Sequence, residues 1–220
     1  MTTPHPPLNF DPASHRYSVE GSPYTSVTQM IGALKLQPPY PEGDPKGLKD
    51  LGVAVHKAAE LAMWDRLDDA TTSPELLPYI AGLREKKREM NIRPIATELQ
   101  LYDPLDGIAG TLDLFCWVYD AELALIDYKR SNSVANCTEL QLAGYERLIR
   151  RADAAGRIEP IRMADGPRCG LHIGYPIRRF SMKLLENRAV VREYLDPQDH
   201  AAWAGAIELY KWASHRPKVV

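Results

Sequence analysis

Apolar residues gather into two short runs in the middle of the chain. The first run occupies residues 110–118 and the second occupies residues 123–129, with a polar break between them. Both runs are bounded by turn residues and rich in aromatic or branched side chains, which is typical of strands. The pattern therefore predicts a β-hairpin centred near Asp120, and this register sets Asp113 opposite Asp127.

Side chains alternate between the two faces of a strand, so this hairpin should present charged groups on an otherwise apolar face. One face of the first strand would carry Thr111, Asp113, Phe115 and Trp117, and one face of the second would carry Leu123, Leu125, Asp127 and Lys129. Opposed Cβ atoms lie about 4.5–5.5 Å apart, and like charges in that position destabilise a sheet. A divalent cation would offset the repulsion.

Two carboxylates and an amine at one place suit the hydrolysis of a phosphodiester. Asp113 and Asp127 would hold Mg²⁺ or Mn²⁺, both of which accept oxygen ligands, and the metal would activate a water molecule. Lys129 could orient or deprotonate that water, or stabilise the developing negative charge. In the alternative interpretation, the two aspartates end their strands and Lys129 extends to solvent.

The remaining pattern predicts an α/β fold, with a mixed central β-sheet flanked by helices. We expect a small hairpin at 10–24, helices at 27–36, 48–66, 76–91, 139–151 and 196–212, and strands at 95–102, 168–175 and 189–195. Thr25 or Ser26 is the expected N-cap of the first helix. We expect one domain over residues 1–220, with residues 1–47 appended to its core.

Net charge, cysteine content and hydropathy restrict the classes of protein to which this chain can belong. A formal net charge of -2 gives no global attraction to nucleic acid, so contacts with DNA would need local basic clusters such as residues 86–88, whose alternative role is a solvated helix face. The three cysteines, Cys116, Cys137 and Cys169, form neither a disulfide framework nor a zinc set. We find no apolar run that could span a membrane and no secretion signal, so we expect a cytoplasmic protein.

Four residues outside the hairpin could complete a site. Glu98 lies on the preceding predicted strand, where it could reach the metal or remain an exposed glutamate. His56 lies on an apolar helix and could be a packed residue or a ligand that favours Mn²⁺ over Mg²⁺. Gln141 and Tyr145, one helical turn apart, could line the core or present an amide and a phenol to phosphate or base.

Taken in order, these pieces resemble the PD-(D/E)xK nuclease superfamily, and within it the RecB-like branch that includes lambda-type phage exonucleases. The resemblance runs from His56 to Tyr145 and rests on His56, Glu98, Gly110-Thr111-Leu112-Asp113, Asp127-Tyr128-Lys129 and Gln141-x-x-x-Tyr145. Each motif alone is weak, whereas the ordered set is specific. It implies the mixed sheet expected above and a metal-dependent deoxyribonuclease of recombination, repair or phage DNA processing.

The resemblance also implies individual roles. Asp113 and Asp127 would be the metal-binding carboxylates, His56 a further ligand, and the backbone carbonyl of Tyr128 another. Lys129 would be the catalytic lysine. Glu98 would assist the metal or the water, and Gln141 and Tyr145 would bind DNA or order the site.

Two departures from the family's pattern refine this expectation. Leu112 stands where the superfamily's name places proline, a replacement that is common in this branch. Several members carry four cysteines for an iron–sulfur cluster, but this chain has three, so we expect no cluster. An exonuclease is the leading expectation, and the alternatives are an endonuclease with the same site, an RNA-cleaving enzyme, or a catalytically idle DNA-binding module. The sequence gives no indication of oligomeric state.

Overall fold

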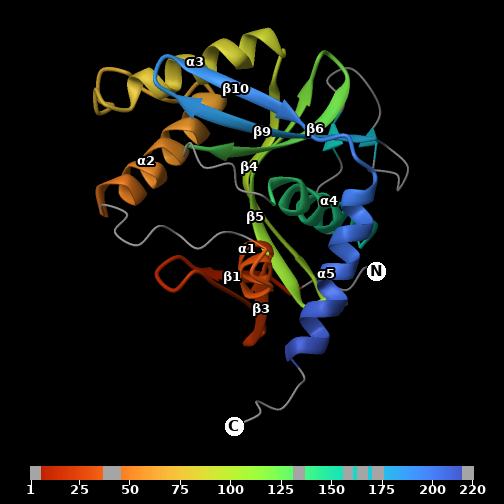
Figure 1. Ribbon diagram of the computed structural model, residues 1–220. Coiled ribbons are helices and arrows are strands. Elements are labelled where there is room, and N and C mark those ends of the chain that lie inside the picture. Colours follow the sequence, from red (N-terminus) through yellow and green to blue (C-terminus); the bar gives the residue numbers. More distant parts are fainter. Residues whose placement is uncertain are drawn as a thin grey trace.

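The computed structural model describes residues 6–36, 46–130, 137–155, 161–162, 168–169 and 176–214 (Figure 1). Among the described residues, eight strands form the main sheet: β1 (Leu8–Asp11), β2 (Arg16–Val19), β3 (Ser22–Ser26), β4 (Arg93–Asp103), β5 (Ile108–Val118), β6 (Glu122–Lys129), β9 (Ile177–Leu185) and β10 (Arg188–Glu193). A separate two-stranded sheet contains β7 (Ile161–Arg162) and β8 (Arg168–Cys169). The rest of the strand predicted at 168–175 lies outside the described residues.

The sheet is mixed, as the sequence predicts. Its strand order is β1-β2-β3-β5-β6-β9-β10, and β4 pairs with β5 from the other side. The pairs β3–β5 and β6–β9 are parallel, whereas the remaining pairs in this sheet are antiparallel. Through the β3–β5 pair, the N-terminal strands join the same sheet as the predicted hairpin.

Helices cover both faces of the sheet (Figure 1). One apolar core lies beneath α1 (Val27–Ala33), α4 (Thr138–Ala154) and α5 (Gln198–Ser214). A second core lies on the opposite face, beneath α2 (Lys46–Met63) and α3 (Leu77–Glu89). The α/β fold class is therefore confirmed, and the five helices match the predicted ones in order.

Local sequence explains where two of these helices form. The Ser26 hydroxyl accepts a hydrogen bond from the Gln29 backbone N–H, and the Gln29 side chain accepts one from the Ser26 N–H, so a capping box begins α1. In α2, Val55, Ala59 and Ala62 recur at helical spacing and are buried in the second core. The predicted N-cap is confirmed, and so is the apolar helix expected to carry His56.

The register of the β5–β6 hairpin is also as predicted. Leu114 pairs with Ile126 and Phe115 pairs with Leu125. Continued by one residue, this ladder sets Asp113 opposite Asp127. The turn occurs at Tyr119 and Asp120, both of which have positive φ.

Strand β9 is absent from the sequence prediction, although it lies between β6 and β10 within the sheet. Two adjacent arginines near its start obscure the alternation of polar and apolar residues. Arg178 pairs with Glu193 and Glu122, while the buried Arg179 reaches Asp199 at 2.9 Å. Because these partners are distant in sequence, periodicity alone could not identify them.

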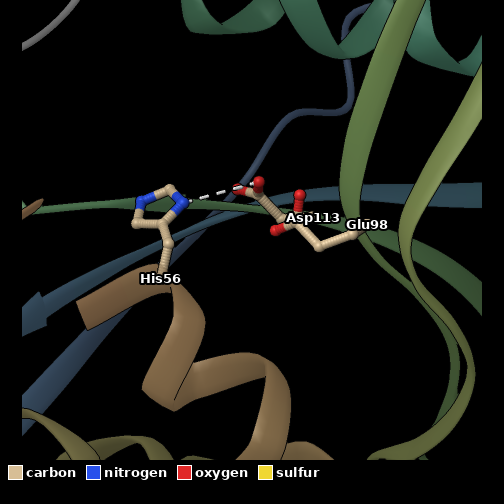
Figure 2. Close-up of side chains that lie close together, drawn as sticks. All are labelled: His56, Glu98 and Asp113. Atoms are coloured by element: carbon tan, nitrogen blue, oxygen red, sulfur yellow. Dashed lines mark ion pairs between the residues drawn. The ribbon is translucent and has the colours of Figure 1, made fainter. Parts of the chain in front are cut away.

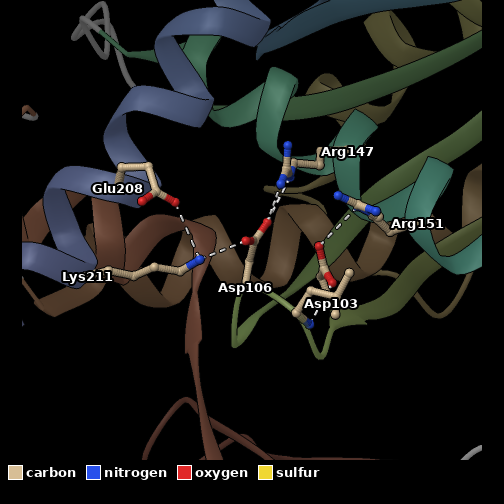
Figure 3. A network of polar contacts seen from close by, with 7 residues as sticks. Asp103, Asp106, Arg147, Arg151, Glu208 and Lys211 are labelled. Carbon is tan, nitrogen blue, oxygen red and sulfur yellow. Dashed lines mark hydrogen bonds and ion pairs between the residues drawn. The ribbon is translucent and has the colours of Figure 1, made fainter.

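A network of ion pairs ties the β4–β5 turn to two helices (Figure 3). Asp106 in the turn accepts hydrogen bonds from Arg147 Nε of α4 and Lys211 Nζ of α5, both at 2.9 Å. Burial would raise the pKa of Asp106, but the hydrogen bonds from Lys211 and Arg147 hold it below its ordinary value. These hydrogen bonds hold the turn that precedes β5 against α4 and α5.

We predict that Asp106→Asn lowers the free energy of unfolding by about 1 kcal/mol at pH 7, because the side chains of its partners are 32% and 35% exposed and solvent weakens both pairs. A depressed carboxyl pKa stabilises the folded state above the unfolded pKa of about 3.9 and loses this effect as pH falls through the folded pKa. The difference from the wild type, measured by urea denaturation, should therefore shrink at pH 3. Glu208→Gln is the control, because Glu208 is exposed and contacts Lys211 only at 3.6 Å. A difference for Asp106→Asn that is unchanged at pH 3 would contradict this account.

Candidate metal centre

In β4 and β5, the face of the sheet toward which side chains point changes at one pair of acidic residues. Its neighbouring pairs set Glu98 of β4 opposite Asp113 of β5. On β5, Leu112 belongs to the core beneath α4, whereas Leu114 belongs to the core beneath α2 and α3. Regular alternation would keep these two leucines on one face. The backbone of Glu98 adopts a φ of 47°, in the left-handed region that a β-strand does not normally use.

This change of face corrects one prediction. Phe115 and Trp117 do share the core beneath α4. Asp113 instead approaches His56 of α2, and Thr111 bonds to Tyr17 of β2. The prediction of a common face was wrong because it assumed unbroken alternation through Asp113.

Three side chains converge at the break (Figure 2). One potential ligand atom from each of His56, Glu98 and Asp113 lies within 4.8 Å of the other two. His56 Nδ1 lies 3.6 Å from Asp113 Oδ1, and the Tyr128 backbone N–H donates to Asp113 Oδ2 at 2.6 Å. The edge-on Tyr128 ring, at 5.9 Å between centroids, also contacts the imidazole. Helix α2 and two strands thus bring together one nitrogen and two carboxylate donors.

The charges of these groups are mutually dependent. Desolvation and the nearby charge of Asp113 raise the pKa of Glu98 to about 7. Burial alone would lower the pKa of His56, but its contact with Asp113 and the charges of Asp127 and Glu98 raise it above the ordinary value. The site therefore has an excess of negative charge that favours a cation or a proton.

A second polar cluster occupies the end of β6, facing α4. Lys129 Nζ lies 2.7 Å from Asp127 Oδ2 and donates to Gln141 Oε1 at 2.9 Å. The Gln141 amide nitrogen donates to Asp127 Oδ1 at 3.0 Å and to the Tyr145 hydroxyl at 3.2 Å. Burial would lower the pKa of Lys129, but Asp127 and Asp113 raise it, so the amine is held as a cation.

The expected pair of metal carboxylates has two different environments. Asp113 belongs to the set with His56 and Glu98, whereas Asp127 is held by Lys129 and Gln141 and is not part of that set among the described residues. Burial, and then the charge of Asp113, raise the pKa of Asp127, although Lys129 acts in the opposite direction. Joint ligation by the two aspartates and a role for the Tyr128 carbonyl both stay predictions.

Gln141 and Tyr145 occupy the interior of the protein. They are 4% and 5% exposed, respectively, so they offer little surface to DNA. Close packing confines Tyr145 further: a Cβ atom added at Gly110 would lie 2.9 Å from its ring. Of the two roles that the resemblance implies for these residues, the geometry favours ordering of the site.

Other features lie apart from these clusters. In the basic run of α3, Lys86 pairs with Glu89 and Lys87 pairs with Asp65, which fits an ion-paired helix face. A hollow of about 370 Å³ is lined by Tyr79, Arg130, Leu185, Glu186 and Arg188, and none of the site residues above lines it.

No family model and no curated protein matches this sequence. The nuclease resemblance therefore rests on the quoted residues alone. Among the described residues, no helix combines the length and the apolar content needed to cross a bilayer.

We predict that Glu98→Gly leaves the free energy of unfolding unchanged or raises it by up to about 1 kcal/mol, because glycine adopts positive φ without the usual cost. Glu98→Gln should retain the strained backbone, so its free energy of unfolding should rise only through the loss of the negative charge. In the same strand, Leu99→Gly should destabilise by about 1 kcal/mol or more, since it removes apolar packing and adds backbone freedom. Urea denaturation of the three variants tests this. Equal destabilisation by glycine at both positions would show that Glu98 is not strained.

Proposed function

We propose that this protein is a Mg²⁺- or Mn²⁺-dependent nuclease that hydrolyses DNA phosphodiester bonds. The observation that carries the proposal is the set formed by His56, Glu98 and Asp113, adjacent in the sheet to the Asp127–Lys129 pair. A divalent ion would offset the carboxylate charges, and the ordered motifs that resemble the RecB-like branch support DNA as substrate. Among nucleases, the same resemblance favours an exonuclease.

The donor set fits such an ion chemically. Carboxylate oxygens suit both Mg²⁺ and Mn²⁺, while the imidazole of His56 favours the softer Mn²⁺. His56, Glu98 and Asp113 would hold the ion, with Asp127 as the predicted fourth side chain. When bound, the metal would supply an activated water and neutralise charge on the phosphoryl oxygens.

Lys129 is the residue that we assign to the reacting phosphate. Its amine is held as a cation by Asp127 and aligned by Gln141, so it can donate a hydrogen bond to a phosphoryl oxygen or to the attacking water. Asp127 keeps the amine charged, and the buried Gln141–Tyr145 pair limits the movement of both groups. If Asp127 and Lys129 only ended a strand and extended to solvent, they would not need these hydrogen bonds to α4.

We predict that Mn²⁺ binds the wild-type protein and that His56→Ala or Asp113→Asn weakens binding by at least about tenfold, the lower range seen even for residues behind metal ligands. Isothermal titration calorimetry measures this without any substrate. His200→Ala is the control, because His200 pairs with Glu146 on a different helix. Equal affinities in all four proteins would refute the metal centre, as would DNA cleavage that persists in excess EDTA.

We predict that Lys129→Ala reduces cleavage of end-labelled linear DNA at least about 100-fold while Mn²⁺ affinity changes little, because the amine acts on the reacting groups. The matched control is Lys183→Ala, since Lys183 stands beside Lys129 in the parallel β6–β9 register. Circular dichroism checks that both variants fold. Normal digestion by a folded Lys129→Ala protein would refute its assigned role. Closed circular DNA in the same assay distinguishes an exonuclease, which needs an end, from an endonuclease.

A further inference from the structure

An exposed tryptophan stands at the end of α2, beside the candidate metal centre. Trp64 is 36% exposed, and its indole N–H donates to Thr97 Oγ1 of β4 at 2.9 Å. This hydrogen bond occupies the only polar group of the indole and limits rotation of the ring. The exposed part of Trp64 is therefore an oriented aromatic surface without an open donor.

The position of Trp64 follows from the same break in the sheet. Thr97 accepts the Trp64 hydrogen bond and the next residue, Glu98, lies near His56, so two consecutive residues of β4 contact α2 and the residue that follows it. On α2, His56 and Glu60 share one face, and Trp64 directly follows Met63, the last residue of the helix. The seven steps from His56 to Met63 rise about 10 Å along the helix, a distance that a few nucleotides can cover.

The positively charged side chain of Arg66 lies over the ring of Trp64. The Arg66 guanidinium carbon lies 5.8 Å from the centroid of the Trp64 ring, in the range of a cation–π contact. Arg66 is exposed, and no carboxylate among the described residues pairs with it. Cations on α2 and α3 differ in this respect, because Lys57 pairs with Glu60 and Lys87 pairs with Asp65. Arg66 is therefore a charge that an anionic ligand can use.

We propose that Trp64 and Arg66 form a nucleotide-binding subsite for a single-stranded segment of the substrate, with one base stacked on the indole and Arg66 on an adjacent phosphate. The proposal rests on the proposed function and specifies its substrate, because a base within a duplex has no free face for the indole. Stacking on an aromatic ring beside a cation is how proteins bind single strands without regard to sequence. The subsite holds the strand whose phosphodiester lies at His56, Glu98 and Asp113.

Tryptophan fluorescence tests the stacking directly. Trp117 and Trp203 are buried, which leaves Trp64 and the 55% exposed Trp212 as the accessible emitters among the described residues. Titration with a short oligothymidylate in EDTA, where no metal-dependent cleavage occurs, should quench the wild type and Trp212→Phe equally. Trp64→Phe should lose most of the quenching. Equal quenching in both variants, or no quenching of the wild type, overturns the subsite.

Affinity gives a second measure. Trp64→Ala should weaken binding of the oligothymidylate by about tenfold, the effect of removing one stacked base. Arg66→Gln should reduce the slope of log affinity against log salt by about 0.7, the value of one phosphate contact on a single strand. The control is Arg192→Gln, since Arg192, on β10, makes a similar contact at 5.0 Å from the centroid of the Tyr194 ring. A slope unchanged in Arg66→Gln, or a blunt duplex that quenches Trp64 as strongly as the single strand, would contradict the proposal.

These measurements separate the subsite from the metal centre. If Trp64→Ala binds Mn²⁺ like the wild type and only the oligothymidylate affinity falls, the subsite is supported. If the wild type binds Mn²⁺ and cleaves DNA but Trp64→Ala binds the strand with unchanged affinity, the subsite is wrong and the proposed function stands. Quenching of Trp64 in a protein that binds no Mn²⁺ would instead support the subsite and refute the metal centre.

Discussion

The reversal of side-chain direction at Glu98 and Asp113 is the constraint on which the candidate site depends. In a regular antiparallel ladder, residues on either side of this pair would keep their faces and Asp113 would lie with Phe115 in the core beneath α4. The left-handed backbone of Glu98 instead accompanies a change of face, so both carboxylates meet α2. Strain of this kind costs about 1–3 kcal/mol and persists only where the surroundings impose it. Here the surroundings are two packed cores and a helix that supplies His56.

The helices on the two faces of the sheet contribute different residues near Asp113. Helix α2 provides the imidazole of His56, while α4 provides Gln141 and Tyr145, which hold Asp127 and Lys129 from the opposite side. Packing keeps α4 close: a Cβ atom on Gly144 would approach the Trp203 ring of α5 to 2.9 Å, and one on Gly110 would approach Tyr145 equally closely. Together with the ion pairs at Asp106, these contacts fix the position of α4 on the sheet. The α2 side remains open enough for His56, Glu98 and Trp64 to face solvent in part.

Much of this arrangement could be predicted from the sequence, and its limits have physical causes. The hairpin register, the Ser26 cap and the order of the helices follow from local periodicity and turn chemistry. Strand β9 does not, because Arg178 and Arg179 are neutralised by partners that only the fold brings near. The ordered motifs selected His56, Glu98 and Asp113 as site residues together with Asp127, but alternation alone gave Asp113 the wrong face. Trp64 follows His56 by eight residues, which could have suggested that the two lie near each other. The sequence does not reveal the hydrogen bond to Thr97 that orients the indole.

Under the proposed function, the reversal in the sheet brings His56, Glu98 and Asp113 together around a divalent ion. Crystals soaked in Mn²⁺ and measured at the manganese absorption edge would locate that ion. We expect an anomalous peak about 2.0–2.3 Å from the nearest nitrogen of His56 and from an oxygen of Asp113. A clear map with no such peak, in which His56 and Asp113 remain in direct contact, would contradict it.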